Sequence, residues 1–148
     1  MIELLHEKYP EKHYVGLDLT PEMINIAQAK KLSNTEFVVG DSENLPFPEG
    51  SFDAVICSNS FHHYPNPQAF FNSAYQVLRK GGRLVLRDYT SSDLMVWLMN
   101  HLEMPLANLF GHGDVRIRKP AEFTAMAEKA GFTVLTIEKQ KGFRAHLV

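Results

Sequence analysis

The chain has 148 residues, 45% of them hydrophobic, and a formal net charge of −2. We expect one globular domain, spanning 1–148. So small a charge leaves no excess of cations for a phosphate backbone, which argues against a nucleic-acid partner. No apolar run approaches the roughly 18 residues that span a bilayer. The single cysteine, Cys57, is expected to be a buried free thiol, which fits a reducing compartment. We therefore expect a cytoplasmic protein that does not bind membranes.

Apolar runs and amphipathic segments alternate along the chain. The expected strands are short apolar runs bounded by turn residues, at 13–17, 36–39, 52–57, 83–87, 132–138 and 143–148. The expected helices have one apolar face, at 2–9, 20–33, 66–80, 94–102 and 119–130, with a shorter helix opened by Pro105 at 105–110. Thr20 and Asn66 are the expected N-caps, and Lys80-Gly81-Gly82 is the expected cationic end and glycine stop of the third helix. The run at 52–57 is continuous, typical of a strand covered on both faces.

Strands that alternate with crossover helices predict an α/β fold with a doubly wound, mostly parallel sheet. The short link at 139–142 makes the last two strands an antiparallel pair. Residues 91–113 interrupt the alternation and predict a helical insertion, either a lid over a ligand or plain helix packing. In open α/β sheets, ligands bind beyond the carboxyl ends of the strands, which here are Asp18, Asp41 and Ser58.

Two aspartates follow the first two strands. Asp18 precedes a helix, where a carboxylate can accept hydrogen bonds from both hydroxyls of a ribose. Capping that helix would fall more naturally to Thr20, which leaves Asp18 for a ligand. Asp41 could accept from an exocyclic amine, or it could close an Asx-turn. Neither aspartate identifies a ligand by itself.

The order of the motifs is more specific than any one of them. Along the chain come the strand-Asp18-helix junction, Gly40-Asp41-Ser42, Leu45-Pro46-Phe47-Pro48, Phe52-Asp53, Phe61-His62-His63 and Leu78-Arg79-Lys80-Gly81-Gly82-Arg83. From about Val15 to Arg87 this order resembles the class I S-adenosylmethionine (SAM)-dependent methyltransferases. It is most similar to the subgroup that acts on small molecules and includes quinone-biosynthesis methylases. The resemblance implies a Rossmann-like fold, SAM as cofactor and a small organic molecule as methyl acceptor.

The resemblance also implies roles for single residues. Asp18 would bind the cofactor ribose, with Leu19 packing beside the adenine. Asp41 would accept from the adenine amine, and Ser42 would contribute backbone beside it. Ser58 would lie near the methionine end of the cofactor.

His62 and His63 lie in the loop after the central strand and are candidates for deprotonating an acceptor. The stronger interpretation is that such a pair caps the loop or lines the pocket, so the catalytic residues stay unassigned. Tyr64 and Tyr89 either line the acceptor pocket or simply pack. No third ligand stands at a recognisable spacing, so we expect no metal site.

The glycine-rich loop of this family has no counterpart before Asp18. In the family it follows a first strand that lies between the strands ending here at Asp18 and Ser58. Without that strand, backbone groups on both neighbours lose their partners, at about 1–3 kcal/mol each when buried. Three repairs are open: the two strands pair directly, another copy supplies a strand in a homodimer, or the chain is part of a longer protein.

We favour the third repair, and therefore a methyltransferase that is truncated and impaired as this chain. The alternative is a non-catalytic remnant of the fold that serves self-association or partner binding. A nicotinamide-dependent oxidoreductase would need a different glycine fingerprint and a Tyr-x-x-x-Lys pair, which the sequence lacks.

Overall fold

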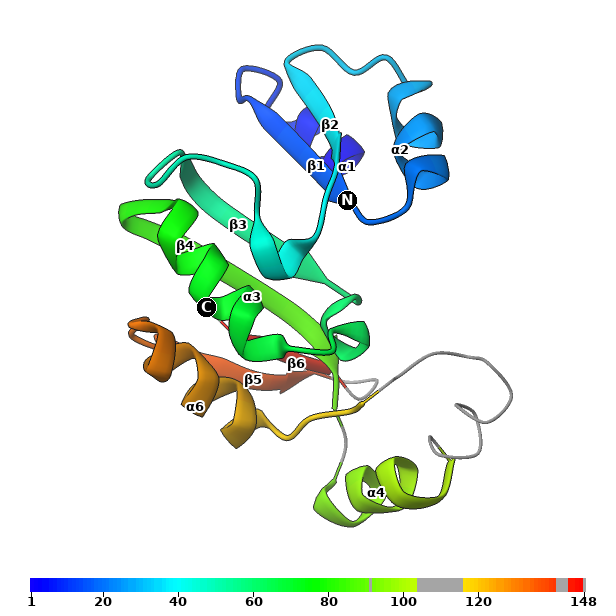
Figure 1. Ribbon diagram of the computed structural model, residues 1–148, viewed down its shortest axis with the longest axis vertical. Coiled ribbons are helices and arrows are strands. Elements are labelled where there is room, and N and C mark those ends of the chain that lie inside the picture. Colours follow the sequence, from blue (N-terminus) through cyan, green and yellow to red (C-terminus); the bar gives the residue numbers. More distant parts are fainter. Residues whose placement is uncertain (91, 104–115, 141–143, 148) are drawn as a thin grey trace. The chain divides into compact units, whose positions relative to one another are not determined.

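The computed structural model describes residues 1–90, 92–103, 116–140 and 144–147 (Figure 1). The chain forms two compact units, Met1–Pro46 and Phe47–Val148, and each is described by itself. The described strands form two sheets, with the orders β1-β2 and β3-β4-β6-β5. Within the described residues, no helix has the length and apolar character needed to cross a bilayer.

The first unit contains a two-stranded parallel sheet. Its elements are α1 (Ile2–Lys8), β1 (Tyr14–Asp18), α2 (Pro21–Gln28), β2 (Thr35–Val39) and the short 3₁₀ helix η1 (Ser42–Asn44). The register runs from Tyr14 opposite Thr35 to Asp18 opposite Val39, and the amide of Gly40 donates to the carbonyl of Asp18 at 2.9 Å. The two strands therefore end at one edge of the sheet, as parallel pairing requires.

The helix α2 is shorter than its sequence pattern predicts. Thr20 is its N-cap and Pro21 its first residue, as expected, and Ile24 is its buried residue. The helix ends at Gln28 rather than near residue 33. Lys31 and Asn34 both have φ of 51°, a left-handed backbone that cannot continue a right-handed helix.

The second unit contains the four-stranded sheet. Its elements are β3 (Phe52–Ser58), the 3₁₀ helix η2 (Phe61–His63), α3 (Pro67–Val77), β4 (Leu78–Tyr89), α4 (Asp93–Leu98), the π-helical turn η3 (Met99–Glu103), α6 (Pro120–Ala130), β5 (Ile137–Gln140) and β6 (Arg144–Leu147). β3 and β4 are parallel, and β6 is antiparallel to both β4 and β5. The expected antiparallel terminal pair is confirmed. Its first strand begins at Ile137 rather than at Phe132, because Phe132 and Val134 pack against the core instead of joining the ladder.

The core of this unit lies between the sheet and two helices, α3 and α6, which lie side by side on one face (Figure 1). Phe61 is completely buried at its centre, and its ring lies 5.4 Å from that of Phe71 and 5.4 Å from that of Phe123. The buried positions of α3 follow helical spacing: Phe70, Phe71, Ala74 and Val77. β4 adds Leu84 and Leu86 at alternate positions.

Lys80-Gly81-Gly82 does not end α3, contrary to the expectation from sequence. The helix ends at Val77 because Leu78 is already extended, with φ −77° and ψ 135°. Phe52 pairs with Leu78 and Ala54 with Arg83, so the glycine pair lies in a bulge of β4. Gly81 has φ of 79°, and a Cβ on Gly82 would lie 2.9 Å from the carbonyl oxygen of Arg79.

The α/β fold class with parallel strand pairs and an antiparallel terminal strand is confirmed. Direct pairing of β1 with β3, one of the three expected repairs, would join the two units and stays a prediction. A single domain over 1–148 and a lid over 91–113 stay predictions. α4 and η3 agree with the first helix of that insertion, whereas the second, around Leu106–Phe110, lies outside the described residues.

Candidate functional site

The carboxyl edge of the β1-β2 pair carries the two aspartates that the sequence predicts to bind a cofactor. Asp18 Oδ1 accepts a hydrogen bond from the amide of Thr20 at 2.9 Å. Asp41 Oδ1 accepts one from the amide of Glu43 at 2.8 Å and so caps η1. Thr20 makes no side-chain cap bond, and the bond from its amide to Asp18 closes an Asx-turn just before α2. The cap weighed for Asp41 from the sequence is therefore present, and Asp18 has a local role that the sequence analysis did not predict.

These local roles leave each carboxylate with a second oxygen. Oδ2 of Asp18 and of Asp41 makes no hydrogen bond to the described residues. Asp18 is half-buried and Asp41 is exposed. Because an ionised carboxylate only accepts hydrogen bonds, the edge suits a ligand rich in donors, such as the hydroxyls and amine of a nucleoside. The residues present thus fit the nucleoside end of the predicted cofactor.

The other predicted cofactor residues lie where the sequence places them, but not in one unit. Leu19 and Ser42 flank the two aspartates in Met1–Pro46, with Leu19 exposed and Ser42 half-buried. Ser58 ends β3 in the second unit, opposite Arg87 of β4. Their contacts with a cofactor stay predictions.

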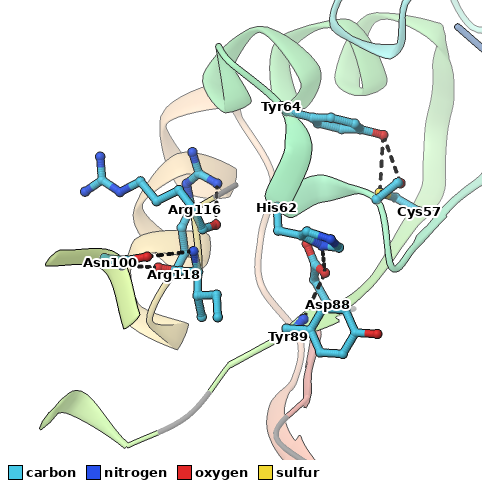
Figure 2. Close-up of polar contacts among 10 residues, drawn as sticks. Cys57, His62, Tyr64, Asp88, Tyr89, Asn100, Arg116 and Arg118 are labelled. Carbon is cyan, nitrogen blue, oxygen red and sulfur yellow. Dashed lines mark hydrogen bonds and ion pairs between the residues drawn. The ribbon is translucent and has the colours of Figure 1, made fainter. Parts of the chain in front are cut away.

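The second unit contains a pair that the sequence analysis did not identify: His62 with Asp88 (Figure 2). His62 Nδ1 lies 2.7 Å from Asp88 Oδ1, and the side chains are 11% and 1% exposed. The same oxygen accepts the amide hydrogen of Tyr89 at 2.8 Å. Since an ionised carboxylate has no hydrogen to donate, Nδ1 of His62 is the donor. In the neutral ring, Nε2 is then left as an acceptor.

The fold holds both partners in place. Leu84, Leu86 and Asp88 alternate along β4 and are all buried, so Asp88 continues the core face of the strand to its end. His62 lies in η2, directly after β3, and its carbonyl accepts the amide hydrogen of Arg116 at 3.0 Å. The parallel β3-β4 pair therefore brings the two residues to the same edge of the sheet.

A signal for Asp88 exists in the sequence. The expected strand stops at Arg87, but the two-residue period of Leu84 and Leu86 continues to Asp88. Aspartate is almost never fully buried unless it has a partner. A charged residue on the core side of a strand therefore predicts a nearby donor, and His62 is that donor.

The surroundings of the pair are aromatic. The ring of His63 lies 4.1 Å from that of His62. The ring of Tyr89, at the end of β4, lies 5.1 Å from the ring of His62. Desolvation lowers the pKa of His63, the neighbouring His62 lowers it further, and Asp88 opposes the shift. Among the described residues, buried Oδ2 of Asp88 has no hydrogen-bond partner. A buried oxygen left in this state requires an explanation, because it costs about 1–3 kcal/mol.

Tyr64 is half-buried and packs against the core. Its hydroxyl lies 3.1 Å from Ser60 Oγ and 3.6 Å from Cys57 Sγ, and its ring packs 5.4 Å from Phe61 (Figure 2). Cys57 is a buried free thiol, as predicted, and burial raises its pKa. Across the described chain, no three histidine, cysteine or acidic side chains are grouped to hold a metal ion.

A parallel α/β sheet with acceptors at the carboxyl ends of its strands defines a class of enzymes that bind nucleotide-like cofactors. The methyltransferase domain family matches residues 1–86, more than half of the chain. The chain belongs to this family, so the predicted membership is confirmed.

Two curated relatives show the range of the similarity. The chain is 44% identical over 81 residues to the phthiotriol/phenolphthiotriol dimycocerosates methyltransferase of Mycobacterium leprae, a match that covers 54% of this chain and 30% of that protein. It is 30% identical over 153 aligned positions to a ubiquinone/menaquinone biosynthesis C-methyltransferase of Rhizobium johnstonii, covering 89% of this chain and 59% of that protein. The chain spans about a third of the length of several such relatives.

Solved structures agree with the fold. A Bacillus halodurans protein assigned as a methyltransferase superposes with a TM-score of 0.75 at 32% identity, covering 86% of this chain and 56% of that one. A SAM-dependent methyltransferase of Aquifex aeolicus superposes with a TM-score of 0.75 over 99% of this chain and 73% of its own. At 19% identity the latter shows the fold alone.

Proposed function

We propose that the protein is a SAM-dependent methyltransferase that acts on a small organic molecule. The observation that carries this proposal is the edge formed by Asp18 and Asp41, where each carboxylate has one oxygen bound locally and one available to a donor. When bound, SAM supplies a methyl group already activated by its sulfonium. The protein's task is then to bind and orient the reactants and to exclude water.

Each predicted cofactor residue has a task in this proposal. Asp18 accepts hydrogen bonds from the ribose hydroxyls, with Leu19 beside the adenine. Asp41 accepts from the adenine amine, with the backbone of Ser42 beside the ring. Ser58 lies near the methionine end.

A small acceptor with apolar surface has two supports. Relatives of the chain are named for quinone biosynthesis and for fatty-acid O-methylation. In addition, α4 exposes the large apolar residues Leu94, Met95 and Trp97. These residues belong to the predicted lid and would cover an apolar ligand better than a charged one.

Calorimetric titration of SAM into the chain tests the proposal. Asp18→Asn and Asp41→Asn each replace one accepting oxygen by a donor, and we expect each to weaken binding roughly 10- to 150-fold, the equivalent of a charged hydrogen bond of about 1.5–3 kcal/mol. Glu36→Gln removes the same charge from exposed Glu36 on β2 and should leave the affinity unchanged. No binding by the wild-type chain, or equal binding by all three variants, would contradict the proposal.

Impairment of this chain is part of the proposal. The sequence has no glycine-rich turn to let the backbone approach the carboxypropyl group, so the two aspartates hold only the nucleoside end. Adenosine should therefore bind nearly as tightly as SAM. A SAM affinity more than tenfold above that of adenosine would show that the methionine end is held as well.

Self-association is the second candidate function, and the open strand edges favour it. Inside its own unit, and among the described strands, β1 pairs only with β2 and β3 only with β4, so each has one edge that its own unit leaves without a strand. Such an edge is a template for pairing with another chain. A homodimer in sedimentation that persists when SAM binding is abolished would support this role, and a monomer at high concentration would exclude it. A cytoplasmic location stays a prediction.

A further inference from the structure

We propose that the second unit binds an extended segment of another protein, which adds a strand to the four-stranded sheet in line with β6. The segment fills a slot between the first half of β4 and the residues that lead into β5, and it carries an aliphatic residue followed by an acidic one. The slot is at the other end of β4 from the His62–Asp88 pair. The proposal therefore goes beyond the proposed function and does not depend on it.

The slot exists because β6 is shorter than the strand beside it. β6 lies between β4 and β5 in the sheet, and among the described residues it pairs with β4 only along 86–89. β4 itself begins much earlier, at Leu78. Neighbouring strands are about 4.7–4.9 Å apart, so where a middle strand ends, its two neighbours enclose a gap one strand wide.

A cavity is found between these two neighbours of β6. Gly82, Arg83 and Leu84 of β4 form one wall, and residues 132–135 form the other. Its volume is about 50 Å³, whereas a single water molecule needs roughly 10–15 Å³. The cavity is therefore larger than a niche for one ordered water, and its walls are the two stretches of chain that a longer middle strand would join.

Both walls have backbone that is held in place without a strand partner on the slot side. Residues 132–136 form neither helix nor strand, although the chain continues from Ile137 as β5. Phe132 and Val134 pack against the core and fix this segment beside the cavity. On the other wall, β3 covers one edge of β4, and the opposite edge along 83–85 is open among the described strands. Fixed, open backbone of this kind is a template for an added strand.

The ladder of β4 with β6 sets the direction and register of the added segment. This antiparallel ladder ends in the pair of Leu86 with Leu147. Continued in the same direction, it puts one residue of the segment opposite Leu84 and the next opposite Arg83. Leu84 is 3% exposed and belongs to the core, so the residue opposite it points to the core and is aliphatic. Leu135, 61% exposed at the other wall, gives that residue a second apolar contact.

Arg83 selects the charge of the following residue. Its side chain is exposed and lies on the other face of the sheet from Leu84, because side chains alternate along a strand. Among the described residues Arg83 makes no ion pair, whereas Arg79 of the same strand is paired with Asp53. An opposite charge directly across an antiparallel pair is stabilising. The residue opposite Arg83 is therefore glutamate or aspartate.

The size of the slot defines the kind of partner. In the 148-residue chain, β6 has one residue after Leu147, whereas the slot takes a residue opposite each position of 82–85. A strand this short is far smaller than a standard interface of about 1,600 Å², so the contact is weak and reversible. Backbone pairing supplies the affinity, and the aliphatic and acidic side chains supply the specificity. The partner is thus a protein that presents such a segment on an exposed tail or loop.

The first test is a titration with the capped peptide Thr-Val-Glu-Thr, whose valine and glutamate match Leu84 and Arg83. We expect millimolar peptide to shift the amide signals of 82–85 and 133–135 of the ¹⁵N-labelled chain to saturation. Exchange of the β4 amides that face the slot should slow as well. The control peptide Thr-Pro-Glu-Thr lacks a strand donor and should not bind. No saturable shift at either wall, or equal binding of the proline peptide, would overturn the proposal.

The second test reverses the charge at the slot. Arg83→Glu should weaken binding of Thr-Val-Glu-Thr by about 3- to 10-fold and strengthen binding of Thr-Val-Lys-Thr by a similar factor. Lys129→Glu makes the same change at an exposed position of α6 and should leave both affinities unchanged. Leu135→Asp should weaken the glutamate peptide at least as much as Arg83→Glu does. Indifference of both peptides to Arg83→Glu would overturn the acidic residue of the segment.

Two further outcomes would assign the slot to a different occupant and overturn the partner protein. Protection of the 82–85 amides that rises with protein concentration, without peptide, would assign the slot to a second copy of the chain. A gene product extended past Val148 that protects the same amides and no longer binds the peptide would assign the slot to its own continuation. The expected result is an unprotected slot in the protein alone and saturable binding of the glutamate peptide.

Discussion

Asn100 exchanges two hydrogen bonds with the backbone of Ile117: Nδ2 donates to the carbonyl at 2.7 Å, and Oδ1 accepts from the amide at 3.0 Å (Figure 2). Only a carboxamide side chain offers a donor and an acceptor side by side. The neighbours of Ile117 are also tied to the site, because the amide of Arg116 donates to His62 and the carbonyl of Arg118 accepts from Thr90 Oγ1. Asn100 thus connects η3 to the segment behind His62.

Asn100→Leu should destabilise this segment. It leaves the amide and carbonyl of buried Ile117 without partners, at about 1–3 kcal/mol for each unsatisfied group. We expect faster hydrogen exchange at the amide of Ile117 and a lower urea midpoint. Asn100→Asp keeps the acceptor and should preserve most of the protection of that amide. Equal protection in the leucine variant would show that the two bonds contribute nothing.

The fold was predictable from local patterns, whereas the His62–Asp88 pair required long-range contacts. Apolar runs and caps located β1, β3 and α3 because each signal lies within one element. Asp88 and His62 are 26 residues apart, and their contact depends on the pairing of β3 with β4. The sequence does not predict the bulge at Gly81 for a similar reason: a glycine pair predicts a positive φ but not whether a helix or a strand surrounds it.

The thiol of Cys57 should react slowly in the folded protein. Burial raises its pKa, although Ser60 and Tyr64 oppose the shift, and only the thiolate is a nucleophile. At pH 8 we expect 5,5′-dithiobis(2-nitrobenzoate) to modify the native chain far more slowly than the chain in urea. Labelling as fast as that of free glutathione would contradict the burial of Cys57.

His63 should make stability fall in weak acid. Its pKa in the folded protein lies below the ordinary histidine value of 6.5, so the unfolded chain binds more protons in the window between the two values. The contribution of His63 to the free energy of unfolding is therefore fully present above pH 6.5 and is lost as the pH falls through the lowered pKa of the folded protein. Because His63 is exposed, the effect should be small. We expect His63→Gln to lose less stability between pH 7.5 and pH 5 than the wild type in urea titrations; an equal or larger loss would refute this assignment.

Phe123 should be a main contributor to the stability of the second unit. It places a side chain from α6 that is 1% exposed against Phe61, with ring centroids 5.4 Å apart. Truncation in a close-packed core removes both the transfer free energy and the contacts around the cavity, so Phe123→Ala should cost about 3–5 kcal/mol. Leu94→Ala, at a residue 69% exposed on α4, should change stability by less than about 0.5 kcal/mol. Urea unfolding followed by circular dichroism measures both. If Phe123→Ala costs no more than Leu94→Ala, α6 does not pack on Phe61. The segment before α6, whose Arg116 amide donates to the carbonyl of His62, would then not be held in place by this packing.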